Sequence, residues 1–148
     1  MLKGANMVKE EQAAEEAWKA LSSCLQDLPF VSRTMQAKPG MDEGPDLLVR
    51  VALPQGEQVL AVQVAGNGQP RHVRSAADRL LRLRESIPQA YSVVVAPYIS
   101  AGSAAICAQE GIGYADLAGN CRLCFGQVYI QREGRPNPAA ARRDLRSL

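Results

Sequence analysis

Two neighbouring runs in which apolar residues alternate with other residues constrain the fold of this chain more than any other feature of the sequence. Residues 46–53 and 58–65 have the two-residue period of β-strands, and residues 54–57 between them have the composition of a tight turn. The two runs therefore predict an antiparallel hairpin. The alternation gives each strand one face made of these residues: Leu47, Val49, Val51 and Leu53 on the first, and Val59, Ala61, Gln63 and Ala65 on the second.

Stretches with helical periodicity lie before and after this hairpin. Residues 9–25 carry apolar side chains at spacings of three and four, with glutamates on the other faces, which predicts an amphipathic helix with acidic first turns. The same spacing recurs over residues 73–87 and ends at Pro88. Residues 36–45 are rich in Pro and Gly, so they are predicted to form a loop.

The second half of the chain has the pattern of a βαβ unit. Residues 92–96 form a short apolar, β-branched run that is typical of a buried parallel strand. Ser100 is the predicted N-cap of a helix that reaches about Glu110, and Gly111 is its predicted C′ residue. A strand over residues 112–116 completes the unit.

Two further short strands are predicted around Gly126, at residues 121–125 and 128–132. The order of elements is then helix, hairpin, helix, strand, helix, strand and two short strands. This order predicts an α/β fold with a mixed central sheet flanked by helices. With 148 residues, of which 47% are hydrophobic, the chain can bury one sizeable core, and we expect residues 1–135 to form a single domain.

Composition and cysteine spacing argue against several classes of protein. No apolar run approaches the roughly 20 residues that span a bilayer, and the N-terminus has no signal-peptide pattern, so a soluble cytoplasmic protein without membrane contact is expected. The four cysteines are unevenly spaced, which indicates reduced thiols. Cys121 and Cys124 have the spacing of half a zinc site but lack a second pair of ligands, and they are predicted to be buried thiols on opposite faces of a strand.

The ends of the predicted hairpin carry a pattern that resembles a known family. Pro45-Asp46 begins one strand, Gln63-Val64-Ala65 ends its partner, and a helix follows. This placement resembles the PD-(D/E)xK nuclease superfamily, whose core is a helix, three strands, a helix and a further strand. The resemblance implies a restriction-endonuclease-like three-layer core, with Asp46, Gln63 and Ala65 at the positions of the first acid, the second acid and the lysine.

In that family the two acids hold Mg²⁺ near the scissile phosphate, and the lysine helps to orient or activate the attacking water. Two hard carboxylates suit a hard cation, which then supplies Lewis acidity. In this chain Gln63 offers only a neutral oxygen and Ala65 offers no ligand, so Asp46 is the single formal negative charge of the set. We therefore predict neither a metal cofactor nor nuclease activity.

A second resemblance concerns residues 96–100 and 110–123, with the sequences APYIS and EGIGYADLAGNCRL. They are similar to a bacterial family in which such a nuclease-like domain precedes a winged helix-turn-helix, and whose members are described as transcriptional regulators or abortive-infection-type antitoxins. The similarity covers roughly residues 44–135. It implies that residues 136–148 are a linker to a winged-helix domain absent from this chain, and that DNA is a partner mainly through that missing domain.

Basic residues concentrate around the second predicted helix. Residues 1–57 have a net charge of −3 and residues 58–148 a net charge of +5. A face that follows nucleic-acid phosphates is predicted from these residues: Arg71, Arg74, Arg79 and Arg82. The alternative is a solvated helix face in which Asp78 pairs with Arg74 and Arg82 at spacings of four.

Asp116 and Asn120 could line a site at the end of a strand, but the safer prediction is that they stabilise the Ala-Gly turn between them. Three hypotheses of function remain. The first is a catalytically degenerate nuclease-like module of a DNA-associated bacterial regulator, acting through binding or homodimerisation. The second is a Mg²⁺-dependent nuclease in which Asp46 is joined by relocated acids, namely Glu57, or Glu15 or Glu16 of the first helix. The third is a dimerisation or protein-interaction module without nucleic-acid contact.

Overall fold

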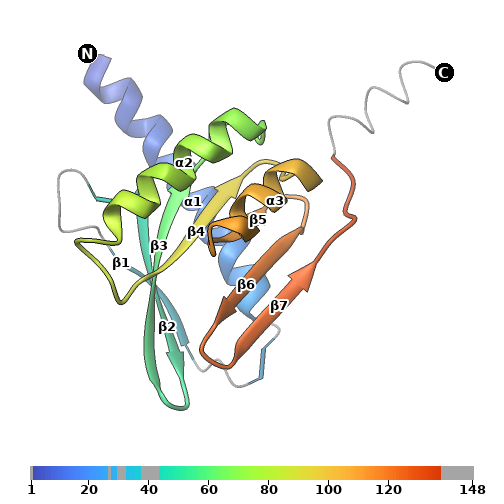
Figure 1. The fold of residues 1–148 in the computed structure, drawn as a ribbon. Coiled ribbons are helices and arrows are strands. Elements are labelled where there is room, and N and C mark those ends of the chain that lie inside the picture. Colours follow the sequence, from blue (N-terminus) through green and yellow to red (C-terminus); the bar gives the residue numbers. More distant parts are fainter. Residues whose placement is uncertain (1, 27, 30–32, 38–43, 138–148) are drawn as a thin grey trace.

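A seven-stranded sheet lies between two layers of helices in the computed structural model, which describes residues 2–26, 28–29, 33–37 and 44–137 (Figure 1). The helices are α1 (Leu2–Gln26), α2 (Pro70–Leu83) and α3 (Ala101–Gln109). The strands are β1 (Arg33–Ala37), β2 (Leu47–Leu53), β3 (Gly56–Val64), β4 (Tyr91–Ala96), β5 (Gly113–Asp116), β6 (Cys121–Phe125) and β7 (Val128–Arg132).

The strands lie in the sheet in the same order as in the chain, from β1 to β7. β3, β4 and β5 are parallel to one another, and all the other neighbours are antiparallel. The predicted mixed α/β architecture is therefore confirmed. The order α1, β1, β2, β3, α2, β4 is also the helix, three strands, helix and strand that the sequence resemblance implies.

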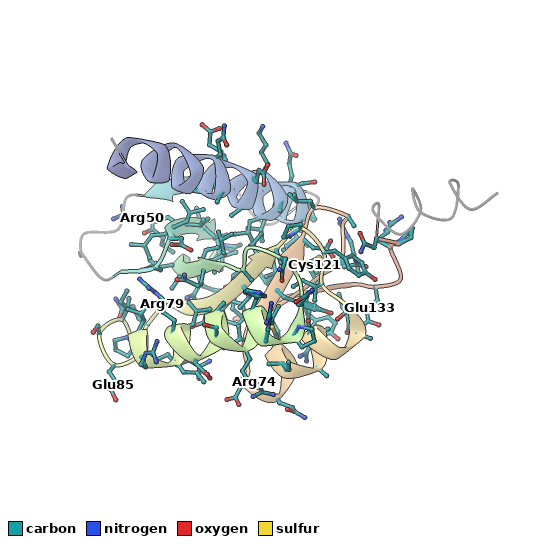
Figure 2. All side chains as sticks on the ribbon, turned by 90° about the horizontal axis from the view of Figure 1, so that it is seen from above. Arg50, Arg74, Arg79, Glu85, Cys121 and Glu133 are labelled. Atoms are coloured by element: carbon teal, nitrogen blue, oxygen red, sulfur yellow. The ribbon has the colours of Figure 1, made fainter. Side chains whose placement is uncertain are left out.

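α1 covers one face of the sheet, while α2 and α3 cover the other, as the view from above shows (Figure 2). The strand alternation decides which residues enter which layer. The face towards α1 buries mainly valine and leucine, including Val49, Leu60 and Val62, whereas Ala61 and Ala65 face α2. Small residues on that second face let the helix pack closely against β3. Among the described helices, none combines the length and the apolar character needed to cross a bilayer.

The N-terminal part of the fold differs from the prediction in two respects. α1 begins at Leu2 instead of residue 9, so Glu10 and Glu11 are not in its first turn, and the predicted acidic first turns are wrong. β1 was not predicted, because residues 36 and 37 were assigned to a loop that also includes residues 38–43, which lie outside the described residues. β1 is an edge strand whose conformation depends on pairing with β2, and such pairing leaves little local signal.

Three other boundaries are set by local chemistry. α2 ends at Leu83, one turn earlier than predicted, and the chain continues in turns in which Ser86 N and Ile87 N both donate to Leu83 O. Leu53 pairs with Gly56, so the β2–β3 hairpin has a two-residue loop and the predicted four-residue turn is too long. The capping prediction for α3 is confirmed: Ser103 N donates a hydrogen bond of 3.2 Å to Ser100 Oγ, and Gly111 has a positive φ of 67°.

The loops that follow β3 and β4 touch at Gly68. A Cβ atom at this position would lie 1.5 Å from the carbonyl oxygen of Tyr98, which no side chain can tolerate. Ser103 Oγ of α3 also donates a hydrogen bond of 2.9 Å to Gly68 O. The two contacts hold the start of α2 against the start of α3.

Gly68→Ala is therefore expected to lower the free energy of unfolding by about 2–3 kcal/mol, because the loop has to move away from Tyr98. Gly66→Ala is the matched control, since a Cβ there meets no atom within 4 Å, and its effect should stay within about 0.5 kcal/mol. Urea unfolding followed by circular dichroism measures both. Equal stabilities of the two variants would contradict the proposed contact.

Candidate functional site

The structure brings Asp46 and Gln63 together at one end of the hairpin. Leu47 pairs with Val62, so the next pair in register is Asp46 and Gln63. The side chain of Asp46 is exposed, and its Oδ2 accepts a hydrogen bond of 2.9 Å from Val64 N. Ala65 lies on the same face as Gln63, two residues further along the chain. The three positions therefore have the placement that the nuclease resemblance implies.

Gln63 is the unusual member of this set. Its side chain is 9% exposed, and its Oε1 is buried without a hydrogen-bond partner among the described residues. Val94 lies opposite it on β4, and alanines flank it on the same face of β3. A buried acceptor without a donor destabilises a fold by about 1–3 kcal/mol. An apolar residue of similar shape at position 63 would remove this cost.

These donors do not fit a divalent cation. Mg²⁺ needs near-octahedral oxygen ligands. The nuclease motif supplies two carboxylates and a lysine, whereas the set here offers one carboxylate, one amide oxygen and a methyl group. Within the described part of the chain, no group of three or more His, Cys, Asp or Glu side chains could hold a metal ion. The pocket that the nuclease motif would supply is incomplete.

Glu57 does not complete it. Glu57 pairs with Ala52, six residue pairs from Asp46, and at about 3.3 Å per residue the two acids are roughly 20 Å apart. Oε1 of Glu57 lies 3.7 Å from Nε of Arg50 instead. The hypothesis that Glu57 replaces the missing acid is wrong, because the hairpin places it at the opposite end.

Glu15 and Glu16 of α1 are exposed. Glu16 lines a cavity of about 110 Å³ next to Val64 and Ala65, but Asp46 does not line that cavity. Glu15 does not line it either. Asp46 therefore does not share this cavity with either glutamate.

The arginines of α2 divide into two groups. Arg71, Arg74 and Arg82 are exposed, and none forms a hydrogen bond or ion pair with another residue in the described ranges. Figure 2 shows Arg74 on the side of α2 away from the sheet. Asp78 lies between them on the helix, yet its predicted ion pairs with Arg74 and Arg82 are not formed within the same ranges. Three guanidinium groups are thus open to solvent.

Arg79 does not belong to this exposed face, and that prediction is corrected. It is half-buried, and its Nη2 donates a hydrogen bond of 3.0 Å to Gly44 O, which ties α2 to the segment before β2. Its Nε is buried and has no partner among the described residues. Arg84 is also structural, because its Nη2 donates to the carbonyl oxygens of Glu110 and Gly111 at 3.3 Å.

Asp116 and Asn120 stabilise a turn, as predicted. Asp116 Oδ1 accepts a hydrogen bond of 2.8 Å from Asn120 N, and its Oδ2 accepts one of 2.8 Å from Asn120 Nδ2 and one of 2.9 Å from Ile99 N. Asn120 continues the network, since its Oδ1 accepts from Arg135 N at 2.9 Å. Both carboxylate oxygens are used within the fold, so this pair does not form an open ligand site.

The cysteines also have structural roles. Cys121 is buried towards α1 and Cys124 is exposed on the opposite face, so the predicted separation is confirmed while the predicted burial of Cys124 is wrong. A hydrogen bond from the Cys24 thiol to Cys121 raises the pKa of Cys24 and lowers that of Cys121. Burial raises the pKa of Cys107 to about 11. A thiol with a raised pKa stays protonated at neutral pH and is a poor nucleophile.

The sequence matches no protein-family model and no curated protein. Two solved structures to which the chain is similar are an EndoMS–dsDNA2 complex and EndoMS in the apo form. The sequence identities are 14% and 16%, and the TM-score is 0.42 in both cases. The alignments cover 68% and 69% of this chain but 44% and 45% of the EndoMS chains, so the chain spans less than half of their length.

Proposed function

We propose that this chain is a nuclease-like module that binds the phosphate backbone of DNA without cleaving it. The observation that carries the proposal is the outer face of α2, where Arg71, Arg74 and Arg82 are exposed and form no ion pair with other described residues. Unpaired guanidinium groups bind phosphate oxygens in a bidentate manner and keep their charge at any physiological pH.

The position of the arginines on the helix supports this assignment. Arg71 and Arg74 lie in the first turns of α2, where the positive end of the helix dipole adds to their charge. Asp78 and Glu85 reduce the net charge of the face, so we expect weak binding that depends on salt and not on sequence. Three phosphate contacts correspond to a slope of about −2.7 in a plot of log K against log salt concentration.

The metal-site residues support binding without cleavage. Asp46 is the only carboxylate among the three motif positions, and Gln63 faces apolar neighbours. Within a DNA-associated bacterial regulator, such a module would add affinity while a separate domain reads the sequence. Homodimerisation of the module stays a prediction, and sedimentation of the purified chain would test it.

Fluorescence anisotropy with a labelled duplex tests the binding. The variant with Arg71→Gln, Arg74→Gln and Arg82→Gln is expected to bind at least about tenfold more weakly at ~50 mM salt and to lose most of the salt slope. Arg50→Gln is the control, because Arg50 is an exposed arginine paired with Glu57 on the hairpin. If the triple variant and the control bind alike, the face of α2 is not the interface.

Incubation with Mg²⁺ or Mn²⁺ tests the absence of cleavage. The duplex is expected to stay intact at protein concentrations that saturate binding. Metal-dependent cutting that disappears in Asp46→Ala would overturn this half of the proposal. Absence of any DNA binding at low salt would instead support a protein-interaction module.

A further inference from the structure

A cleft of about 550 Å³ lies between α3 and strands β5 to β7, on the face of the sheet that also carries α2. Its volume is within the range of about 300–1,000 Å³ that is typical of small-molecule sites. None of the arginines of α2 lines it. The cleft is therefore separate from the proposed DNA-binding face.

One wall of the cleft is apolar. α3 presents a side made only of alanines, and the ring of Tyr114 from β5 and the residues before α3 continue this wall. The residues of the wall are Ala101, Ala104, Ala105, Ala108, Tyr98, Ile99 and Tyr114. Because no side chain on this side of α3 is larger than a methyl group, the space next to the sheet stays open.

The floor of the cleft carries Arg122 of β6. Arg122 lies between Tyr114 of β5 and Gln131 of β7 in the register of the sheet. It is half-buried, and its side chain forms no hydrogen bond or ion pair with any residue of the described ranges. A guanidinium group that is partly removed from water and has no protein partner is poised to bind an anion.

Glu133 limits the negative charge of the ligand that the cleft can bind. It lies at the end of β7, and its Oε1 accepts a hydrogen bond from Gln131 Nε2. Glu133 and Arg122 do not form an ion pair within 4.0 Å. The cleft thus offers one positive group with one acid at its edge, which suits a singly charged carboxylate better than a doubly charged phosphate.

We propose that this cleft binds a small carboxylate ligand with a compact aromatic or apolar body, and that the carboxylate pairs with Arg122. The planar fork of the guanidinium matches the two oxygens of a carboxylate. The alanine wall and the rings of Tyr98 and Tyr114 receive the apolar body.

Isothermal titration with 3-phenylpropionate, 3-phenylpropionamide and phenyl phosphate tests the proposal on the full chain. The carboxylate is expected to bind at least about tenfold more tightly than the neutral amide, because only the carboxylate forms a charge-assisted pair. Phenyl phosphate is expected to bind more weakly than the carboxylate because of Glu133. Equal binding of the acid and the amide, tighter binding of the phosphate, or no binding would each overturn the proposal.

Two variants test the assignment to this cleft. Arg122→Gln is expected to remove the preference for the acid over the amide, whereas the surface control Arg50→Gln keeps it. Ala105→Phe is expected to block binding of both probes by filling the cleft, and because Ala105 is exposed the fold should tolerate the change. Undiminished binding of 3-phenylpropionate by either Arg122→Gln or Ala105→Phe would overturn the assignment.

Discussion

Asp116→Ala is expected to lower the free energy of unfolding by about 3–5 kcal/mol. The carboxylate accepts three hydrogen bonds in a site that is 2% exposed. Alanine would leave Ile99 N and Asn120 N without an acceptor, together with one of the two N–H groups of Asn120 Nδ2, whose other N–H donates to Arg135 O. A buried donor without a partner destabilises a protein by about 1–3 kcal/mol. The total loss of stability is large because three hydrogen bonds are lost at once. These bonds also hold two separate loops to the end of β5. Urea unfolding monitored by circular dichroism gives the value.

The matched control is Asp78→Ala. Asp78 is an exposed aspartate on α2 that makes no hydrogen bond or ion pair with other described residues, so its loss should change the stability by less than about 0.5 kcal/mol. Hydrogen exchange adds a local measurement, since the amide of Ile99 should lose its protection in Asp116→Ala. If the two aspartate variants have equal stability, the hydrogen-bond network is not what holds these loops.

Gln63→Glu combined with Ala65→Lys is expected to create a divalent-metal site with Asp46. The change supplies the second acid and the lysine at positions that the hairpin register already places together. At a Mn²⁺ concentration of about 100 times the dissociation constant, binding should stabilise the variant by about 2.7 kcal/mol. Thermal unfolding with and without Mn²⁺ measures the effect.

The pH dependence of Gln63→Glu alone, which lacks the cation introduced by Ala65→Lys, gives a second test. Position 63 is nearly buried among apolar residues, so the introduced carboxyl should have a pKa above its unfolded value. Stability of the metal-free variant should then be greatest in acid and fall as the pH rises through that pKa, because the folded state binds more protons there. Added Mn²⁺ should reverse the loss at neutral pH.

Gln63→Leu is the control for this experiment. Leucine has a similar shape and removes the unpaired amide oxygen, so the variant should be at least as stable as the unchanged chain and should not respond to Mn²⁺. A strong response of the unchanged chain to Mn²⁺ would show that its donors hold a cation after all.

Much of the sheet was predictable because the signals are local. The period of two fixed the faces of β2 and β3. The register that brings Asp46 next to Gln63 was not predicted, because it depends on a two-residue loop that is shorter than the predicted four-residue turn. β1 was missed, since its five residues form a strand through pairing with β2 and not through their own preference. The start of α1 was missed for a related reason: residues before position 9 have no strong apolar period.

The candidate sites were less predictable, because they depend on the direction in which each side chain points from its helix or strand. Arg79 differs from its neighbours only by its angle around α2, which turns it towards Gly44. The cleft around Arg122 combines four elements, so no single stretch of sequence reveals it. The spacing of the alanines at 101, 104, 105 and 108 was the one available signal, and on its own it indicates only a helix side without large residues.

The agreement between strand order in the sheet and strand order in the chain has a consequence for folding. Each strand pairs with the one made just before it, so the sheet has no strand that must wait for a distant partner. The largest separations between paired strands are those bridged by a single helix, which keeps the contact order low. The topology therefore permits the sheet to grow from β1 towards β7 as the ribosome releases the chain, with the newest strand forming the edge to which the next one adds.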